Sequence, residues 1–155
     1  MGEDKPYCGP GVTPGKILGI DYGMRRIGIA VTDQNGTFAS PLAVIPNHGH
    51  KKTAAALADL IKREGVELVV MGLPLYRDGN ESPMSTAVRE FAAVLAETGV
   101  AVTFWEESHT SQRAEDHIKN TLGIRNPKKI AEIVDKMAAY MILSEYIDCN
   151  KTTRR

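Results

Sequence analysis

Hydrophobic residues alternate with polar or small residues over three segments in the first third of the chain. A period of two is typical of strands whose two faces meet different surroundings. The segments follow one another through short connections, so the pattern predicts an antiparallel meander. The predicted strands cover about residues 16–22, 26–33 and 36–45, and Pro46 ends the last one.

The rest of the chain alternates between helical spacing and short apolar runs. Leu68 to Met71 form an unbroken apolar run that Gly72 and Pro74 end, which is typical of a buried parallel strand. Ser82 followed by Pro83 favours the start of a helix. In order, the pattern predicts a helix over 52–64, a strand over 68–71 and a helix from 82 to 99. A strand over 100–105 and helices over about 110–121 and 128–147 follow.

This order of elements predicts one α/β domain, in which a five-stranded mixed sheet is flanked by helices. The meander supplies antiparallel pairs, and the later strands join in parallel. A chain of 155 residues with 43% hydrophobic residues is long enough for one such core. We expect residues 1–15 to be a flexible tail, 16–148 to form the domain, and 149–155 to be a short basic tail.

Composition narrows the expected setting of this domain. Lys plus Arg and Asp plus Glu both number 19, which argues against nucleic-acid binding through bulk charge and leaves room for a local basic patch. Cys8 and Cys149 lie far apart without C-x-x-C spacing, which favours a reducing cytosol over a disulfide framework or a zinc site. No apolar run reaches the length of a membrane span. The sequence therefore predicts a cytoplasmic protein without membrane contact.

Asp21, at the end of the first predicted strand, is the first candidate for chemistry. Because side chains alternate, Ile17, Gly19 and Asp21 share one face, and rigid backbone holds the carboxylate at the rim of the sheet. A glycine turn follows, and Arg25 and Arg26 place positive charge beside the acid. An acid next to two arginines indicates a site that acts on phosphates. An Asp that only hydrogen-bonds a β-turn is the alternative.

Carboxylates also follow the last predicted strand and occur in the final helix. Glu106 and Glu107 end the strand over 100–105, at the same kind of rim as Asp21 if the strands are neighbours. Alternation points only one of them to the site, and the sequence leaves open which one, or whether both belong to a solvated loop. Asp135 shares a helix face with small and apolar residues, which aims it at the strand ends. A capped or salt-bridged Asp135 is the alternative.

Three carboxylates from distant segments would form an oxygen-rich site, and oxygen ligands suit Mg²⁺ or Mn²⁺. Two such ions activate water and stabilise a leaving oxygen, which favours hydrolysis of phosphodiester bonds. The histidines offer no competing metal site, so all four are expected to be structural or solvated. They are His48, His50, His109 and His117.

These motifs resemble the YqgF/RuvX family of RNase H-like nucleases over most of residues 16–148. The most specific likeness is D-Y-G-x-x-R-I-G-x-A from Asp21, followed by GLPL from Gly72, VREFAAVL from Val88 and DKMAAYMIL from Asp135. The resemblance implies an RNase H-like fold, with the catalytic first aspartate at Asp21 and the helical one at Asp135. It also implies activity as a Holliday junction resolvase or as a pre-16S rRNA nuclease.

One block departs from the family pattern. The family usually shows D-E-R-x-T-T, whereas this chain reads E-E-S-H-T-S from Glu106 to Ser111. Glu107 keeps the glutamate and is the third expected metal ligand and catalytic residue, with Glu106 as the alternative ligand. The arginine is replaced by serine, which bears on phosphate contact and on activity. Thr110 and Ser111 keep hydroxyls that contact nucleic acid or cap the following helix.

The leading hypothesis is a metal-dependent endonuclease for structured nucleic acid. Asp21, Glu107 and Asp135 bind Mg²⁺ or Mn²⁺, while Arg25 and Arg26 contact the phosphate backbone. Processing of the 5′ end of pre-16S rRNA is the favoured role, and Holliday junction resolution is the same chemistry on branched DNA. A nucleic-acid or ribosome-binding module without turnover is a further alternative. The sequence contains a single copy of the D-x-G block, which argues against an ATPase or sugar kinase, and it leaves monomer or homodimer undetermined.

Overall fold

The computed structural model describes residues 15–76, 78–107, 120 and 123–153, without the side chains of Glu107, Asp135 and residues 150–153. Its strands form one five-stranded sheet in the order β3-β2-β1-β4-β5. The pairs β1–β2 and β2–β3 are antiparallel, and the pairs β1–β4 and β4–β5 are parallel, as the sequence predicts. The strands are β1 Lys16–Asp21, β2 Arg26–Thr32, β3 Ala39–Pro46, β4 Val66–Pro74 and β5 Ala101–Glu107. The helices are α1 His50–Glu64, α2 Pro83–Ala96 and α4 Pro127–Thr153.

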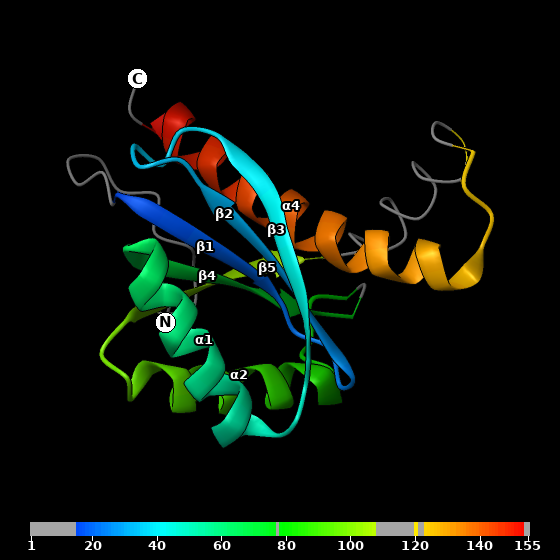
Figure 1. Ribbon diagram of the computed structural model, residues 1–155, viewed down its shortest axis with the longest axis horizontal. Helices are drawn as coiled ribbons and strands as arrows, with labels where there is room; N and C mark the ends of the chain where they lie inside the picture. The colour runs from blue at the N-terminus through cyan, green and yellow to red at the C-terminus, as the bar shows by residue number, and fades with distance from the viewer. Residues whose placement is uncertain (1–14, 77, 108–119, 121–122, 154–155) are drawn as a thin grey trace.

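Helices cover both faces of the sheet (Figure 1). On one face, α1 and α2 pack against Leu18 and Ile20 of β1 and alternate residues of β2 and β4. On the other face, α4 shares a core with Ile17 of β1, through Tyr146 and Ile147 among others. Helices therefore cover both faces of the central strand β1. This is why the residues on each of its faces must be apolar or small.

The strand β3 begins at Ala39 rather than at residue 36, because the connection from β2 is a closed turn. The Asp33 carboxylate accepts hydrogen bonds from the backbone N–H groups of Thr37 and Phe38, at 2.8 and 3.3 Å. These donors, that of Thr37 above all, hold the pKa of Asp33 below its usual value. The Asp33 side chain thus holds Thr37 and Phe38 in a turn, although the alternating pattern assigns both residues to a strand.

β4 and α4 exceed their predicted lengths by the most. β4 starts at Val66, because Gly65 adopts a left-handed conformation (φ 69°) that ends α1 and lets the strand begin at the next residue. α4 continues to Thr153, past the predicted end at 147 and into the expected tail, since no Gly or Pro interrupts it. The predicted helix over 110–121 lies almost wholly outside the described residues. No helix in the described part of the chain is long and apolar enough to cross a membrane.

Cys149, in the last turns of α4, is disulfide-bonded. The expectation that the cysteines do not form a disulfide was therefore wrong. The sequence has one other cysteine, Cys8, which lies outside the described residues. A disulfide requires proximity in space, and the distance between two cysteines along a folded chain does not limit it.

Gly19 is the point at which α4 approaches β1 most closely. A Cβ atom at this position would lie 2.8 Å from Leu143 Cβ and 3.1 Å from the carbonyl oxygen of Ala139. Ala138 and Ala139 are fully buried, so the helix also presents small residues to the sheet. Small residues on both elements therefore set the depth at which α4 lies on β1.

We predict that Gly19→Ala destabilises the protein by about 1–3 kcal/mol, because the added methyl group overpacks atoms that cannot rotate away. Denaturant or thermal unfolding measures the loss. Gly15→Ala is the matched control, since its Cβ would meet the movable end of the Glu67 side chain, at 3.1 Å. Unchanged stability in Gly19→Ala would contradict the close approach.

Candidate active site

Asp21 is the last residue of β1 and belongs to the face of the sheet that α4 covers. Ile17 lies in the core under α4, Gly19 contacts α4, and the intervening Ile20 lies in the opposite core. Asp21 is half-buried and pairs with Gly28 of β2. The predicted alternation is confirmed for Ile17 and Gly19, and it extends to Asp21 at the rim.

Arg26 shares the face and the edge of Asp21. Ile27 and Ile29 of β2 lie in the core under α1 and α2, so alternation turns Arg26 toward α4. Its side chain is exposed and lines a cavity of about 520 Å³ between the end of β3 and the first turns of α4. Arg25 is exposed in the β1–β2 turn. Of the two predicted arginines, Arg26 therefore lies on the same face and edge as Asp21, and Arg25 lies at the margin of the candidate site.

Two aromatic side chains identify the faces of β5. Trp105 donates a hydrogen bond from Nε1 to Glu145 Oε2 of α4, at 2.9 Å. Phe104 packs on the other face, where the Arg89 guanidinium of α2 lies 5.2 Å from its ring centroid. Continued alternation assigns position 106 to the α2 face and position 107 to the α4 face. Position 107 therefore shares the face of Asp21, and position 106 does not.

Strand register carries positions 21 and 107 to the same edge. Ile20 pairs with Met71, and Met71 pairs with Phe104, so these three residues lie level across the sheet. Asp21 comes directly after that level on β1, and Glu107 comes after it on β5, with β4 between them. Both follow the carboxyl ends of parallel strands, where ligands of open α/β sheets bind.

The helix α4 brings position 135 to this edge as well. Its last turns pack with Ile17 at the start of β1, whereas Glu132 and Lys136 line the cavity beside the start of β2. The helix therefore runs antiparallel to β1 and begins at the edge that holds Asp21. Asp135 lies between the two cavity-lining residues along the helix, so its backbone lies at this edge.

The donor chemistry of these three positions fits a hard divalent cation. Asp21, Glu107 and Asp135 all carry carboxylates, and each comes from a different element. Oxygen donors of this kind suit Mg²⁺ or Mn²⁺. Among the side chains that the structure describes, no group of three His, Cys, Asp or Glu could hold a metal ion.

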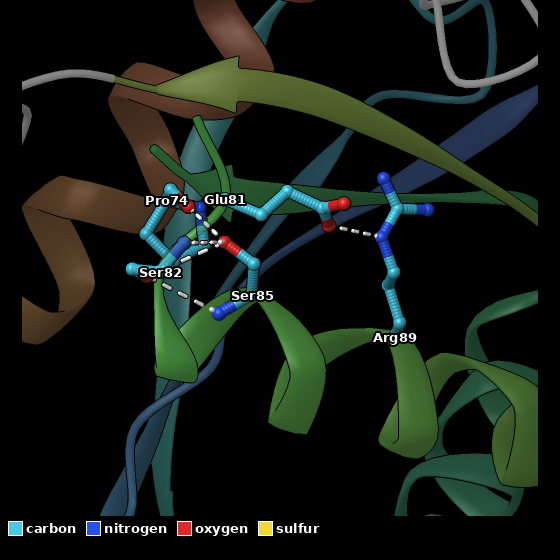
Figure 2. A network of polar contacts seen from close by, with 5 residues as sticks. All are labelled: Pro74, Glu81, Ser82, Ser85 and Arg89. Carbon is cyan, nitrogen blue, oxygen red and sulfur yellow. Dashed lines mark hydrogen bonds and ion pairs between the residues drawn. The ribbon is translucent and has the colours of Figure 1, made fainter. Parts of the chain in front are cut away.

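A polar network fixes α2 to the end of β4 (Figure 2). The buried Ser85 hydroxyl donates to the Pro74 carbonyl, and Ser82 and Ser85 form a capping box at the start of α2. Arg89 Nε donates to Glu81 Oε1 on the same side. Because Pro74 pairs with the last residue of β5, this network supports the backbone of position 107 from the face opposite α4.

Other predicted residues have separate outcomes. His48 is exposed, and His50 shares a 3.1 Å hydrogen bond with the Tyr22 hydroxyl, so these two histidines are solvated and structural, as expected. Asn47, which hydrogen-bonds the turn after Asp21, was not predicted, since an Asn in a loop is too common to be a signal. Outside the described residues lie His109, Thr110, Ser111 and His117.

A larger hollow, of about 700 Å³, lies at the opposite edge of the sheet. Its lining includes Gly65 and Val66 between α1 and β4, and Gly99 before β5. None of the predicted site residues lines this hollow. The larger hollow and the predicted site residues therefore lie at different edges of the sheet. The carboxyl edge is the better candidate site, because the acid and arginine positions converge there.

Known proteins are similar in sequence to this chain over most of its length. The family model of RuvX, described as a Holliday junction resolvase, matches residues 15–149. A protein of Chloroflexus aggregans is 40% identical over 136 residues, which cover 87% of this chain and 94% of that protein. One of Chloroflexus aurantiacus is 36% identical over 137 residues, covering 88% of each chain. Both relatives carry the provisional name pre-16S rRNA nuclease.

Solved structures share the fold at lower identity. RuvC of T. thermophilus, in complex with a Holliday junction substrate, matches with a TM-score of 0.55 and 18% identity, covering 90% of this chain and 97% of that chain. The fowlpox virus resolvase, in complex with Holliday junction DNA, matches with a TM-score of 0.53 and 14% identity, covering 86% and 97%. The RNase H-like mixed sheet is therefore confirmed. With the family model matched over residues 15–149 and relatives at 36% and 40% identity, this protein belongs to the RuvX family.

Proposed function

We propose that this protein is a metal-dependent endonuclease that hydrolyses phosphodiester bonds of structured RNA, in 5′ end processing of pre-16S rRNA. The observation that carries the proposal is the shared face and edge of Asp21, Arg26 and strand position 107. The helix α4 begins at the same edge, and the backbone of position 135 lies there. Acids and an arginine gathered at the carboxyl ends of parallel strands suit a phosphate substrate.

In this proposal Asp21, Glu107 and Asp135 hold Mg²⁺ or Mn²⁺ through their carboxylate oxygens. Bound metal ions of this kind activate water and stabilise the leaving oxygen of a phosphodiester. Arg26 orients the phosphate backbone by charge-assisted hydrogen bonds, and Arg25 adds positive charge at the margin. Since acidic and basic residues both number 19, this local charge has to replace a broad basic surface.

Thr110 and Ser111 follow β5 closely in the sequence and would add hydroxyl contacts to the substrate phosphate. The preceding E-E-S departs from the family's D-E-R, so the arginine that the family usually has there is absent. A hydroxyl cannot replace the paired hydrogen bonds and the charge of a guanidinium. Substrate binding therefore depends more strongly on Arg25 and Arg26 in this chain.

RNA is the better candidate substrate than branched DNA. The relatives that are 36% and 40% identical carry the rRNA nuclease name, whereas the complexes with Holliday junctions are those of proteins 14% and 18% identical. Hydrolysis of the phosphodiester is the same chemistry in both cases. The two substrates differ in shape and in the 2′-hydroxyl groups that RNA alone carries.

We predict that Asp21→Asn lowers Mg²⁺- and Mn²⁺-dependent cleavage of a pre-16S rRNA 5′ segment by about 100-fold or more, since the substitution removes the charge that holds the metal. Cleavage is measured beside a synthetic four-way DNA junction, with a chelator as the metal-free control. Asp59→Asn, the same change at an exposed position of α1, should retain wild-type activity.

Full activity in Asp21→Asn would show that the catalytic assignment is wrong. Cleavage of the junction alone would replace RNA by branched DNA as the substrate. If the wild-type protein binds RNA at every Mg²⁺ and Mn²⁺ concentration and cuts neither substrate, the protein is a binding module.

We also predict that Glu107→Gln lowers kcat by about 100-fold, whereas Glu106→Gln stays within about threefold of wild type. The two substitutions are chemically identical and occupy adjacent positions, and the contacts of Trp105 and Phe104 support opposite faces of β5 for them. Steady-state cleavage rates of both variants decide between them. A larger loss in Glu106→Gln would reverse the assignment.

A further inference from the structure

We infer that Asn47 is a positioning residue that holds the β1–β2 turn, and with it Asp21 and Arg25, in the geometry the reaction needs. The inference rests on the proposed function, because it concerns the same site. Asn47 follows β3 directly and lies before α1, far from the acids in sequence. Its contacts reach across to the turn that links the catalytic strand to Arg26.

Asn47 binds the turn at two points. Its Nδ2 donates to the carbonyl of Gly23 at 2.9 Å, and its backbone N–H donates to the carbonyl of Arg25 at 2.9 Å. Both carbonyls belong to the short connection between Asp21 and Arg26. Two hydrogen bonds from one residue fix both the position and the tilt of this connection.

The Asn47 side chain is itself fixed by its neighbours. Its Oδ1 accepts from the Gly49 N–H at 3.1 Å and from the Thr53 hydroxyl at 3.2 Å. Thr53 is 2% exposed, and its Oγ1 also accepts from the His48 N–H at 2.9 Å. The amide therefore has a defined orientation before any substrate arrives, which is what a positioning residue requires.

Tyr22, the first residue of the same turn, links the turn to α1. Its hydroxyl shares a 3.1 Å hydrogen bond with His50 Nε2, and its ring lies against Phe91 of α2, with the centroids 5.2 Å apart. Tyr22 is 7% exposed and follows Asp21 directly. His50, the first residue of α1, and Asn47, just before it, thus contact the turn on the two sides of Gly23.

The rest of the turn needs this support because packing holds only Tyr22. Met24 is 64% exposed, and Arg25 and Arg26 are also exposed. Gly23 turns so tightly that a Cβ there would lie 2.4 Å from the carbonyl oxygen of Arg26. Glycine has the largest conformational freedom to lose, so the turn would open readily without external hydrogen bonds.

The consequence for the reaction is geometric. A catalytic carboxylate and a phosphate-binding guanidinium act only within a narrow range of positions, and a shift of about 1 Å can cost up to about 100-fold in rate. Asn47 touches neither group, so it acts through the turn that carries them. Its loss should lower both turnover and substrate affinity.

The test is Asn47→Leu, which keeps side-chain size and neutrality but removes the amide. We expect kcat on the RNA segment to fall about tenfold, and KM to rise by a few-fold because the same turn carries Arg25. Hydrogen exchange of the residue-47 backbone amide, which donates to Arg25, should become faster. Thr53→Val, which removes the supporting hydroxyl, should act in the same direction, and the two changes should not be additive.

The matched control is Asn35→Leu, at an exposed position in the turn at the other end of β2, where kcat and exchange should not change. A lower melting temperature in Asn47→Leu with unchanged kcat would show a merely structural role and overturn the inference. Unchanged exchange at residue 47 would overturn it as well. If the wild-type protein or Asp21→Asn shows that the proposed function fails, the exchange measurement still decides whether Asn47 holds the turn.

Discussion

The close approach of α4 to β1 at Gly19 is the contact on which the rest of the molecule depends. A Cβ atom added at Gly19 would lie only 2.8 Å from Leu143 Cβ. The contact that closes the core at this point also sets the geometry of the site. Asp21 lies two residues beyond Gly19 on the same face, and Asp135 lies one helical turn before Ala139, whose carbonyl meets Gly19. Any change in the depth of α4 therefore moves position 135 relative to Asp21. The stability of the core and the placement of position 135 thus depend on one packing distance.

Most of the sheet could be predicted because its strands have contrasting faces. Alternation in β1 and β2 reflects two separate cores, and the apolar run in β4 reflects burial on both faces. The start of β3 could not be predicted from alternation, since the Asp33 carboxylate takes Thr37 and Phe38 into a turn. The disulfide of Cys149 could not be predicted from spacing, because a disulfide depends on proximity in space and not on distance along the chain.

The candidate site divides in the same way. Asp21 could be placed from its own strand, because β1 alternates without interruption. The faces of positions 106 and 107 could not be predicted from the sequence, since β5 gives no strong contrast between its faces; the hydrogen bond of Trp105 to Glu145 of α4 orients the strand. Asn47 could not be found at all, because its role depends on partners in a distant turn and no spacing encodes them.

The site is thus held by two kinds of force, and they respond differently to thermal motion. Packing against the sheet fixes α4, and a packed core opens only when much of the domain unfolds. Hydrogen bonds from Asn47 hold the β1–β2 turn, and such bonds at an exposed turn break locally at small cost. Loss of these hydrogen bonds should therefore displace the arginine side of the site more than it displaces Asp21, whose backbone also belongs to β1. In the proposed nuclease, this division places Asp21 on the rigid part of the site and leaves the position of the arginines to the hydrogen bonds of Asn47.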